Sequence, residues 1–402
     1  MASHVRYTRV LHWGPLIALI IITYISLYSI YCAMQWWPVH TLGGFLHMAV
    51  YLTWESLILY NFFNSIYVGP GTVPLGWEPE KMEDTQFLQY CVICEGYKPP
   101  RSHHCRKCQR CIMKMDHHCP WINNCVGHKN HLSFTAFLLY APIGCAHSLC
   151  IIIPSMYWAM YRTYYHRYGR GEEPDVFLTV NAFIAGMFAV GLSIGVVLAV
   201  GGLLFLQVRS ILRNETGVET WIKDKANYRR RDDSEEFVYP YNLGRWANWC
   251  MVCHCRRRPE LDGFWWPVRD GCDQYTFTVE QLEQKKDKRE HSVEYVIKKP
   301  YSGTICPIYM GPRVCFGSPC TDEPRIRVCK GDHTIVTRWK RHWLYGTKAL
   351  DTMQIGNTKK RERGWFPRQC AVEVLNDGFV DQPEADGYRG SVEDSFNTKK
   401  DR

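Results

Sequence analysis

The chain has 402 residues, of which 46% are hydrophobic, and it carries a formal net charge of +9. This length allows one large domain or two to three ordinary ones, and no recognised nucleic-acid-binding motif accompanies the charge, which disfavours a nucleic-acid-binding protein. The hydrophobic residues are unevenly distributed, because long apolar segments alternate with polar, basic ones.

Four segments have the length and composition of membrane-spanning helices, since about 20 apolar residues are enough to cross a bilayer. They are residues 11–34, 42–67, 132–160 and 177–208. The first, third and fourth contain no Asp, Glu, Lys or Arg, whereas Glu55, Asn61 and Asn64 interrupt the second. Polar groups within a membrane usually face the interior of a helix bundle, so we expect Glu55 to contact a partner helix or a cavity.

Basic residues predict the orientation of these segments. The first segment is longer than the apolar core of a signal peptide and no small-residue cleavage site follows it, so we expect it to remain as a membrane helix. Lys and Arg number two in the first ten residues, eight in 69–131 and seven in 209–231. The opposite connections carry none in 35–41, and three balanced by three acids in 161–176. The positive-inside rule therefore places both termini and the 69–131 connection in the cytosol, with basic surface facing anionic lipid.

Seven of the 19 cysteines lie between Cys91 and Cys125. They form a C-x2-C pair, then the run HHCRKCQRC, then the run DHHCPWINNC. A reducing cytosol disfavours disulfides, so this spacing predicts zinc. Two tetrahedral sites need eight ligands, and seven cysteines and four histidines are available. If every cysteine binds metal the protein is a zinc scaffold, whereas if one is spared, six cysteines and two histidines make two Cys3His sites.

Cys119 is the candidate for the spared thiol. It directly follows Asp116, His117 and His118 and precedes a Pro-Trp step. An acid can orient an imidazole, and the imidazole can take the thiol proton so that the thiolate attacks a substrate. A purely structural Cys119 is the alternative that the pattern alone leaves open.

The run from Cys91 to Asn130 resembles the DHHC cysteine-rich domain of the protein S-acyltransferases, or palmitoyltransferases. The positions that carry the resemblance are Arg101, His103, His104, Asp116-His117-His118-Cys119, Pro120-Trp121 and Asn124-Cys125-Val126-Gly127. Four membrane helices with this domain between the second and third are also the architecture of that family. The run that carries the resemblance is 40 residues long.

The resemblance implies two structural zinc ions, each with four protein ligands and no open position for substrate. One set of ligands is Cys91, Cys94, His104 and Cys111, and the other is Cys105, Cys108, His118 and Cys125. His117 and Cys119 then stay free. The residues by themselves do not choose His104 over His103.

The resemblance also implies a two-step acyl transfer from palmitoyl-coenzyme A. Cys119 would attack the thioester with His117 as general base and Asp116 fixing the histidine tautomer, and a cysteine of a membrane-associated substrate protein would then accept the chain. The four-helix bundle would supply the apolar slot. Trp121, Thr216 and Glu219 are further candidates for binding the co-substrate.

Three shorter segments resemble other motifs of the family, two of them with departures. Thr216-Gly217-Val218-Glu219 stands where the family carries Thr-Thr-x-Glu, and the missing hydroxyl puts the expected contact with Asp116 in question. Gly69-Pro70-Gly71 keeps the turn of an Asp-Pro-Gly motif without its carboxylate. Residues 240–249 are similar to the C-terminal conserved segment, with Asn248 at the place of a buried asparagine or, alternatively, an ordinary loop residue.

Residues 301–376 predict a small β domain, because short apolar runs alternate with glycines and turns. They resemble an SH3 domain through the positions Lys330-Gly331-Asp332, Trp343, Gly346 and Gly364-Trp365-Phe366-Pro367. An Ala-Leu-Tyr-Asp-Tyr stretch is missing and Cys370 replaces a groove tyrosine. We therefore expect an SH3-like domain used for internal docking or substrate choice rather than for proline-rich peptides.

Two remaining features concern thiols and location. Cys250, Cys253 and Cys255 lie in a basic setting and could bind metal, accept acyl chains or be ordinary thiols. Lys399 and Lys400 fit a dilysine retrieval signal, and this ending together with the SH3-like segment resembles the endoplasmic-reticulum branch of the family.

The predicted architecture is a polytopic helical membrane protein with a zinc-bound cytosolic domain and a C-terminal SH3-like β-barrel. Its expected parts are residues 1–68, 69–131, 132–210, 211–300, 301–376 and a tail over 377–402. The leading hypothesis is a protein S-acyltransferase, with an accessory or SH3-docking protein as a further partner. The alternative is a membrane-anchored zinc-binding adaptor without catalysis.

Overall fold

The computed structural model describes residues 8–231, 236–253, 261–321, 323–348 and 362–374. The chain divides into two compact units, residues 1–282 and 283–402. Each unit is described by itself below. Cys255, the dilysine ending and the expected tail from residue 377 lie outside the described residues.

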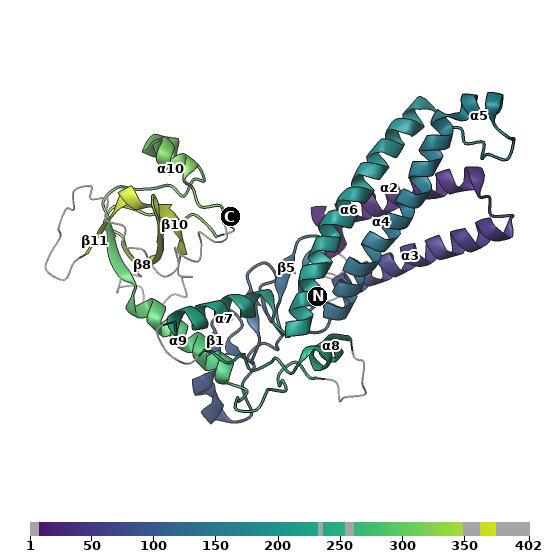
Figure 1. Cartoon of the computed structure of the whole chain (residues 1–402). Coiled ribbons are helices and arrows are strands. Elements are labelled where there is room, and N and C mark those ends of the chain that lie inside the picture. The colour runs from purple at the N-terminus through teal and green to yellow at the C-terminus, as the bar shows by residue number, and fades with distance from the viewer. Residues whose placement is uncertain (1–7, 232–235, 254–260, 322, 349–361, 375–402) are drawn as a thin grey trace. The chain divides into compact units, whose positions relative to one another are not determined.

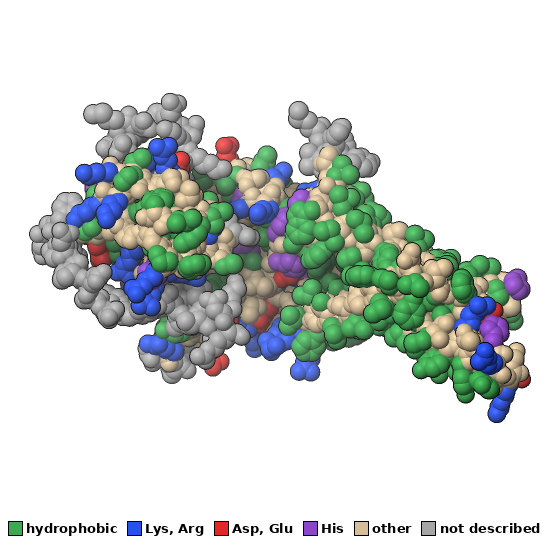
Figure 2. All heavy atoms as spheres, turned by 90° about the horizontal axis from the view of Figure 1, so that it is seen from above, with side chains coloured by type: hydrophobic (Ala, Val, Ile, Leu, Met, Phe, Trp, Pro, Cys, Tyr) green, Lys and Arg blue, Asp and Glu red, His purple; other side chains and the backbone are tan. Residues whose placement is uncertain are grey.

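The first unit is built on four long helices that run side by side (Figure 1). They are α2 (Trp13–Trp36), α3 (Leu42–Tyr67), α4 (His131–Met160) and α6 (Val180–Arg213). All four are long and apolar enough to cross a membrane, which confirms the four predicted segments to within a few residues. Hydrophobic side chains cover the outside of this bundle, as Figure 2 shows. A short helix, α5 (Arg162–Tyr168), follows α4 at one end of the bundle (Figure 1).

Polar side chains inside the bundle face neighbouring helices. The hydroxyls of Tyr51 on α3 and Ser148 on α4 lie 3.0 Å apart. Glu55, one turn further along α3, directs its Oε1 toward Gly144 of α4, where a Cβ atom would lie 3.9 Å away. The expectation that Glu55 contacts a partner helix is therefore confirmed.

The cysteine-rich connection between α3 and α4 folds into three short antiparallel hairpins. They are β1–β2 (Gln89–Cys91 and Gly96–Lys98), β3–β4 (His103–Cys105 and Arg110–Ile112) and β5–β6 (His117–Cys119 and Asn124–Val126). The third hairpin is tied to the end of α3, because the Asn124 and Asn130 side-chain amides donate to the carbonyls of Ile66 and Ser65, each at 2.9 Å. These bonds fix the hairpin at the end of the helix bundle.

Three further helices follow α6 in the chain, and the last of them continues past the end of the first unit at residue 282. Two 3-10 turns precede β1. The helices are α7 (Gly217–Arg229), α8 (Arg245–Cys253) and α9 (Thr276–Glu290), and the turns are η1 (Arg9–Leu11) and η2 (Met82–Phe87). Asn248 on α8 is fully buried. Its side chain accepts from the Leu243 amide at 3.0 Å and donates to the Leu212 carbonyl at 2.9 Å, which joins α8 to the end of α6. The interpretation of Asn248 as a buried asparagine is confirmed.

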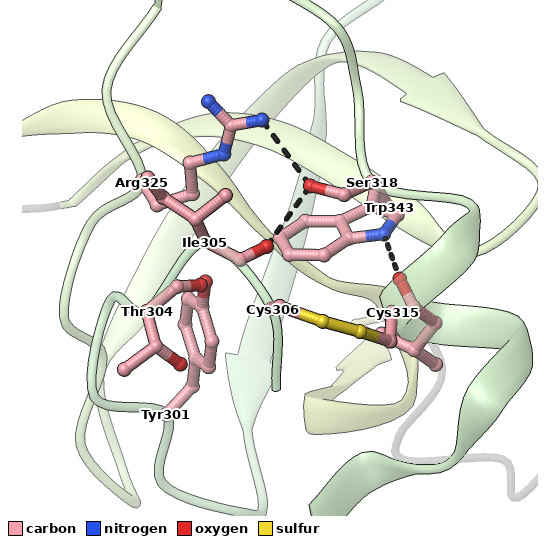
Figure 3. Close-up of a disulfide and its surroundings, with 9 residues drawn as sticks. Tyr301, Thr304, Ile305, Cys306, Cys315, Ser318, Arg325 and Trp343 are labelled. Atoms are coloured by element: carbon pink, nitrogen blue, oxygen red, sulfur yellow. Dashed lines mark hydrogen bonds between the residues drawn. A yellow bond between two sulfur atoms is a disulfide. The ribbon is translucent and has the colours of Figure 1, made fainter. Parts of the chain in front are cut away.

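The second unit contains a five-stranded antiparallel sheet with the strand order β10-β9-β8-β7-β11. Its strands are β7 (Val293–Ile297), β8 (His333–Lys340), β9 (Trp343–Lys348), β10 (Arg363–Pro367) and β11 (Ala371–Glu373). Between β7 and β8 lie η3 (Ile308–Met310) and α10 (Pro312–Phe316), and η5 (Arg368–Cys370) joins β10 to β11. The core includes Trp343, Phe366 and Cys370, all fully buried. Cys306 and Cys315 form a disulfide beside α10 (Figure 3).

Candidate active site and metal centres

The three hairpins bring metal-ligand side chains into two clusters. The first cluster contains Cys91, Cys94, His104 and Cys111, and the second contains Cys105, Cys108, His118 and Cys125. Within each cluster the ligand atoms all lie within 4.8 Å of one another. Among the described residues these are the metal-ligand groups that the structure forms, and they are the two sets that the family resemblance implies.

The spacing of the ligand atoms fits zinc. His104 Nδ1 lies 3.4 Å from the sulfurs of Cys91 and Cys94, and His118 Nδ1 lies 3.4 Å from that of Cys108. The sulfurs of Cys108 and Cys125 are 3.6 Å apart. A tetrahedral zinc ion with Zn–S of about 2.3 Å and Zn–N of about 2.0 Å separates its ligands by about 3.5 to 3.8 Å. Both Cys3His sets therefore suit a structural zinc ion.

The second cluster repeats the first after 14 residues. Each ligand of the first set has its counterpart 14 positions later, so that Cys91 corresponds to Cys105 and His104 to His118. The turns repeat too, because the residue after each knuckle has a positive φ: 52° at Glu95, 54° at Gln109 and 45° at Asn123. The same hairpin is thus built three times.

The third hairpin is a metal knuckle without its second ligand. Another step of 14 residues from Cys105 arrives at Cys119, but the step from Cys108 arrives at Ile122, which is fully buried. Leu132 and Leu139 stand where the third histidine and cysteine would have to be. Cys119 therefore has the backbone geometry of a zinc ligand, but it belongs to no metal-ligand group within the part of the chain that the structure describes.

Apolar side chains surround Cys119 instead of metal ligands. Its side chain is buried among Phe62 and Ile66 of α3 and Phe134 and Leu138 of α4. Partly buried residues of the other two helices also pack against this group: Ala18 and Leu19 of α2, and Val200 and Leu204 of α6. All four membrane-spanning helices thus contribute apolar surface to the surroundings of one thiol.

Asp116 and His117 form an acid–imidazole pair beside this thiol. The Asp116 Oδ2 and His117 Nδ1 atoms lie 3.0 Å apart. Burial alone raises the pKa of Asp116, but the hydrogen bond with His117 and the charges of His131 and His117 lower it to about 2. Burial lowers the pKa of His117, whereas its hydrogen bonds to Asp116 and Cys119 raise it to about 10. The imidazole therefore holds a proton between a carboxylate and the thiol.

The contact between Asp116 and the start of α7 is present in spite of the missing hydroxyl. The backbone amide of Gly217 donates to Asp116 Oδ1 at 2.7 Å. Gly217 is the first residue of α7, so the positive end of the helix dipole also faces this carboxylate. The side chains in the sequence could not predict this contact, because its donor is a backbone amide.

Thr216 and Glu219 stabilise α7 and its link to the metal domain. They form a reciprocal capping box at the start of α7. Both oxygens of Glu219 also accept from Arg101, each at 2.7 Å, and both side chains are fully buried. Burial raises the pKa of Glu219, but the charge and hydrogen bonds of Arg101 lower it overall. Thr216 and Glu219, which we expected near the co-substrate, thus stabilise the start of α7, where the Gly217 amide donates to Asp116.

Trp121 stands at the other side of the site. It is 44% exposed, and its ring packs edge-on against Trp13 of α2 at 5.8 Å. The backbone of Pro120 passes so close to Gly14 that a Cβ atom there would lie 2.0 Å from the Pro120 carbonyl oxygen. The start of α2 therefore closes over the loop that carries Cys119.

Lys114 is a buried residue that the sequence interpretation did not single out. Its side chain is 4% exposed and its ammonium lies 5.5 Å from the centre of the Trp266 ring. Burial and the charge of Arg101 lower its pKa to about 7.

Of the other predicted thiols, Cys250 and Cys253 lie on α8 and belong to neither metal cluster.

Comparison with known proteins agrees with this geometry. Residues 84–224 match the family model described as DHHC palmitoyltransferase. The chain is 48% identical over 395 residues to Palmitoyltransferase ZDHHC6 of Mus musculus, covering 95% of each protein. It is also 48% identical over 397 residues to the Homo sapiens protein of that name, covering 94% of this chain and 95% of the relative. Probable protein S-acyltransferase 16 of Arabidopsis thaliana is 30% identical over 248 residues, which cover 59% of this chain and 82% of the relative.

These relatives are enzymes by name, which disfavours the non-catalytic zinc adaptor. The agreement covers nearly the whole chain and includes the segment that holds both metal clusters and the acid–imidazole–thiol group. The chain therefore belongs to the DHHC palmitoyltransferase family and is a protein S-acyltransferase.

Proposed function

We propose that Cys119 is the nucleophile and that the co-substrate is palmitoyl-coenzyme A. The observation that carries this proposal is a single thiol excluded from both metal clusters, placed beside an acid–imidazole pair and among apolar side chains of all four long helices. The apolar side chains suit a long acyl chain, and the imidazole lies beside the thiol that would attack. Asp116 fixes the tautomer of His117 and is itself held by Gly217.

The reaction divides into two thioester exchanges. The Cys119 sulfur forms a bond to the acyl carbonyl carbon, the bond to the coenzyme A sulfur breaks, and the leaving thiolate takes the proton that His117 holds. In the second exchange His117 takes the proton of a substrate cysteine, whose sulfur attacks the acyl-enzyme. The Cys119 thiolate leaves and the enzyme returns to its first state. The two zinc ions hold the hairpins in shape, through the eight ligands described above.

Labelled palmitoyl-coenzyme A tests this assignment. The purified chain should take up label that hydroxylamine removes, as a thioester requires. Cys119→Ser should abolish the uptake and keep two zinc ions per chain, because the thiol is not a ligand. Loss of about one zinc in the variant would contradict the assignment and favour a structural cysteine.

We further propose an endoplasmic-reticulum membrane protein with both termini and the metal domain in the cytosol. Basic residues in 69–131 and 209–231 support this orientation. The substrates are then membrane-associated proteins with cytosolic cysteines. We keep the division into residues 1–68, 69–131 and 132–210. We move the boundary between the part that begins at residue 211 and the C-terminal domain from residue 301 to Val293, where β7 begins, since β7 pairs with β8 and β11.

We infer that the C-terminal domain is an SH3-like barrel used for docking or substrate choice. Strands β10 and β11 lie at opposite ends of the strand order, yet only the three residues of η5 join them. This short connection supports the closure of the sheet into a barrel. Its aromatic face is already covered. Trp365 is 2% exposed and donates to Glu323 at 2.9 Å, and Arg338 stacks on Tyr345 at 4.0 Å. A proline-rich peptide would have to displace these contacts, so an accessory protein would dock elsewhere on the domain.

A further inference from the structure

Four large apolar side chains are exposed on one loop of the C-terminal unit. We call residues 301–320 the apolar loop. Ile305 is 71% exposed, Ile308 79%, Tyr309 64% and Phe316 89%. Single exposed apolar residues are ordinary, but several on one short segment indicate a surface that binds something.

The apolar loop is held in a fixed shape. The disulfide between Cys306 and Cys315, with a Cα–Cα distance of 4.8 Å, joins the two ends of the segment that carries Ile308 and Tyr309 (Figure 3). Ile305 and Phe316 are the sequence neighbours of these two cysteines. The Trp343 indole donates to the Val314 carbonyl at 3.0 Å. A reducing cytosol would open the disulfide, but this backbone contact does not depend on it.

A second set of bonds anchors the start of the loop to its end. The Ser318 hydroxyl donates to the Ile305 carbonyl at 3.2 Å, and the Arg325 guanidinium donates to the same hydroxyl at 3.2 Å (Figure 3). The four apolar side chains are therefore displayed by a preorganised surface, which lowers the entropic cost of binding.

The charges of the loop select among partners. From Lys298 to Cys320 the sequence contains three basic residues, Lys298, Lys299 and Arg313, and no acid. Arg341 is a further basic residue near the loop. It is the neighbour of His342, whose ring would lie 3.3 Å from a Cβ atom at Gly317, and the charges of Arg341 and Arg313 both lower the pKa of His342. Exposed apolar side chains on a segment with basic residues and no acid match a surface of acyl chains below anionic head groups.

We propose that the apolar loop inserts into the surface of an anionic phospholipid bilayer. The unit belongs to a chain with four membrane-spanning helices, so a lipid surface is present at a high effective concentration. Tyr309 and Phe316 are of the aromatic type that suits the interface between head groups and acyl chains. The loop would then give the C-terminal unit a lipid contact of its own.

Photo-crosslinking of the full chain in lipid nanodiscs tests this proposal. The photoreactive residue benzoylphenylalanine replaces Phe316 in one protein and Ile335 in the control. Ile335 lies on β8 of the same unit and is 46% exposed, but it is not part of the loop. Nanodiscs contain phosphatidylcholine with or without phosphatidylserine. Hydroxylamine removes thioester-linked acyl groups before detection, so that only photo-adducts are counted.

We expect several-fold more phospholipid adduct at position 316 than at position 335, with a several-fold decrease when phosphatidylserine is left out or when Arg313→Glu is introduced. Equal lipid yields at the two positions would overturn the proposal. So would adducts of position 316 with protein alone, which would make the loop a protein-docking surface. A yield at position 316 that ignores both phosphatidylserine and Arg313 would refute the role of charge.

Discussion

Two neighbouring histidines have different surroundings although they are consecutive in the sequence. His117 is 44% exposed in its side chain and lies 3.0 Å from Asp116, whereas His118 directs Nδ1 toward three sulfurs of the second metal cluster. They occupy adjacent positions of β5, so their side chains point to opposite faces of the hairpin. One strand thus separates the histidine that we propose as catalytic from one that belongs to a metal cluster.

This separation predicts opposite outcomes for two alanine substitutions. His117→Ala should remove acyl-enzyme formation and keep two zinc ions, because the side chain contacts no metal ligand set. His118→Ala should lower the zinc content by about one and destabilise the domain, since a tetrahedral site loses one of four ligands. Zinc analysis and labelling with acyl-coenzyme A check both. Equal loss of zinc in the two variants would defeat the division of roles.

Gly217 offers a sharper test of the acid. Gly217→Pro removes the amide hydrogen that Asp116 accepts, yet proline suits the first position of a helix and Thr216, with ψ at 162°, suits the residue before it. A hydrogen bond to a charged group contributes about 1.5–3 kcal/mol, so acyl-enzyme formation should slow about tenfold or more. Gly217→Ala keeps the amide, and its Cβ would meet Asp116 at an ordinary 3.7 Å. Equal rates for the proline and alanine variants would show that the bond is unimportant.

The residue spacing held more information than ligand counting used. The 14-residue period relates Cys91 to Cys105 and Cys111 to Cys125, but it leaves His103 and His104 as alternatives, because His103 repeats as His117 and His104 as His118. The same period places Cys119 at the position equivalent to the ligand Cys105, and Ile122 at the position equivalent to the ligand Cys108. By contrast, the Gly217 contact could not be predicted, because it depends on where a backbone amide lies and not on a side chain.

At the scale of elements, the four long helices were predictable because apolar length alone defines them. The predicted and observed bounds of α3 are identical, in spite of Glu55. The three hairpins have only three residues in each strand, too few for an alternating pattern to appear. Their existence depends on metal ligands and positive-φ turns instead. The contacts of Arg101 with Asn214, Glu219 and Tyr239 could likewise not be predicted, since they join single residues that are far apart in the sequence.

The Arg101–Glu219 pair should couple the metal domain to α7. Glu219→Gln leaves the buried guanidinium without its counter-charge, which costs about 3 kcal/mol of unfolding free energy. Arg101→Met should cost a similar amount, and the double variant should cost less than the two together. Thermal unfolding of the zinc-saturated protein in detergent measures all three. Additive losses would mean that the two side chains act independently.

At the scale of the whole molecule, the orientation in the membrane is the main prediction. The only Asn-x-Ser/Thr site of the chain is Asn214-Glu215-Thr216, and we expect no glycan there. In the structure Asn214 is 2% exposed and its side-chain oxygen accepts from Arg101 at 3.1 Å. A missing glycan would therefore not distinguish the cytosol from the lumen, although an attached glycan would still contradict the orientation.

An epitope tag gives a more decisive test. Inserted after Gly171, in the exposed connection between α5 and α6, the tag should be lumenal and resist antibody until all membranes are permeabilised. A matched tag at the C-terminus should react once the plasma membrane alone is opened. Reaction of both tags at the first step, or of neither, would reject an orientation with both termini in the cytosol.

The interleaved metal clusters have a consequence for the order in which the protein is made. Cys105 and Cys108 of the second cluster precede Cys111, the last ligand of the first. During synthesis, four cysteines at 91, 94, 105 and 108 leave the ribosome before either correct set is complete. Four thiolates are a full coordination shell for zinc. The nascent chain can therefore hold an ion in the wrong set first, and it reaches its native state only by exchanging two ligands after Cys111 emerges.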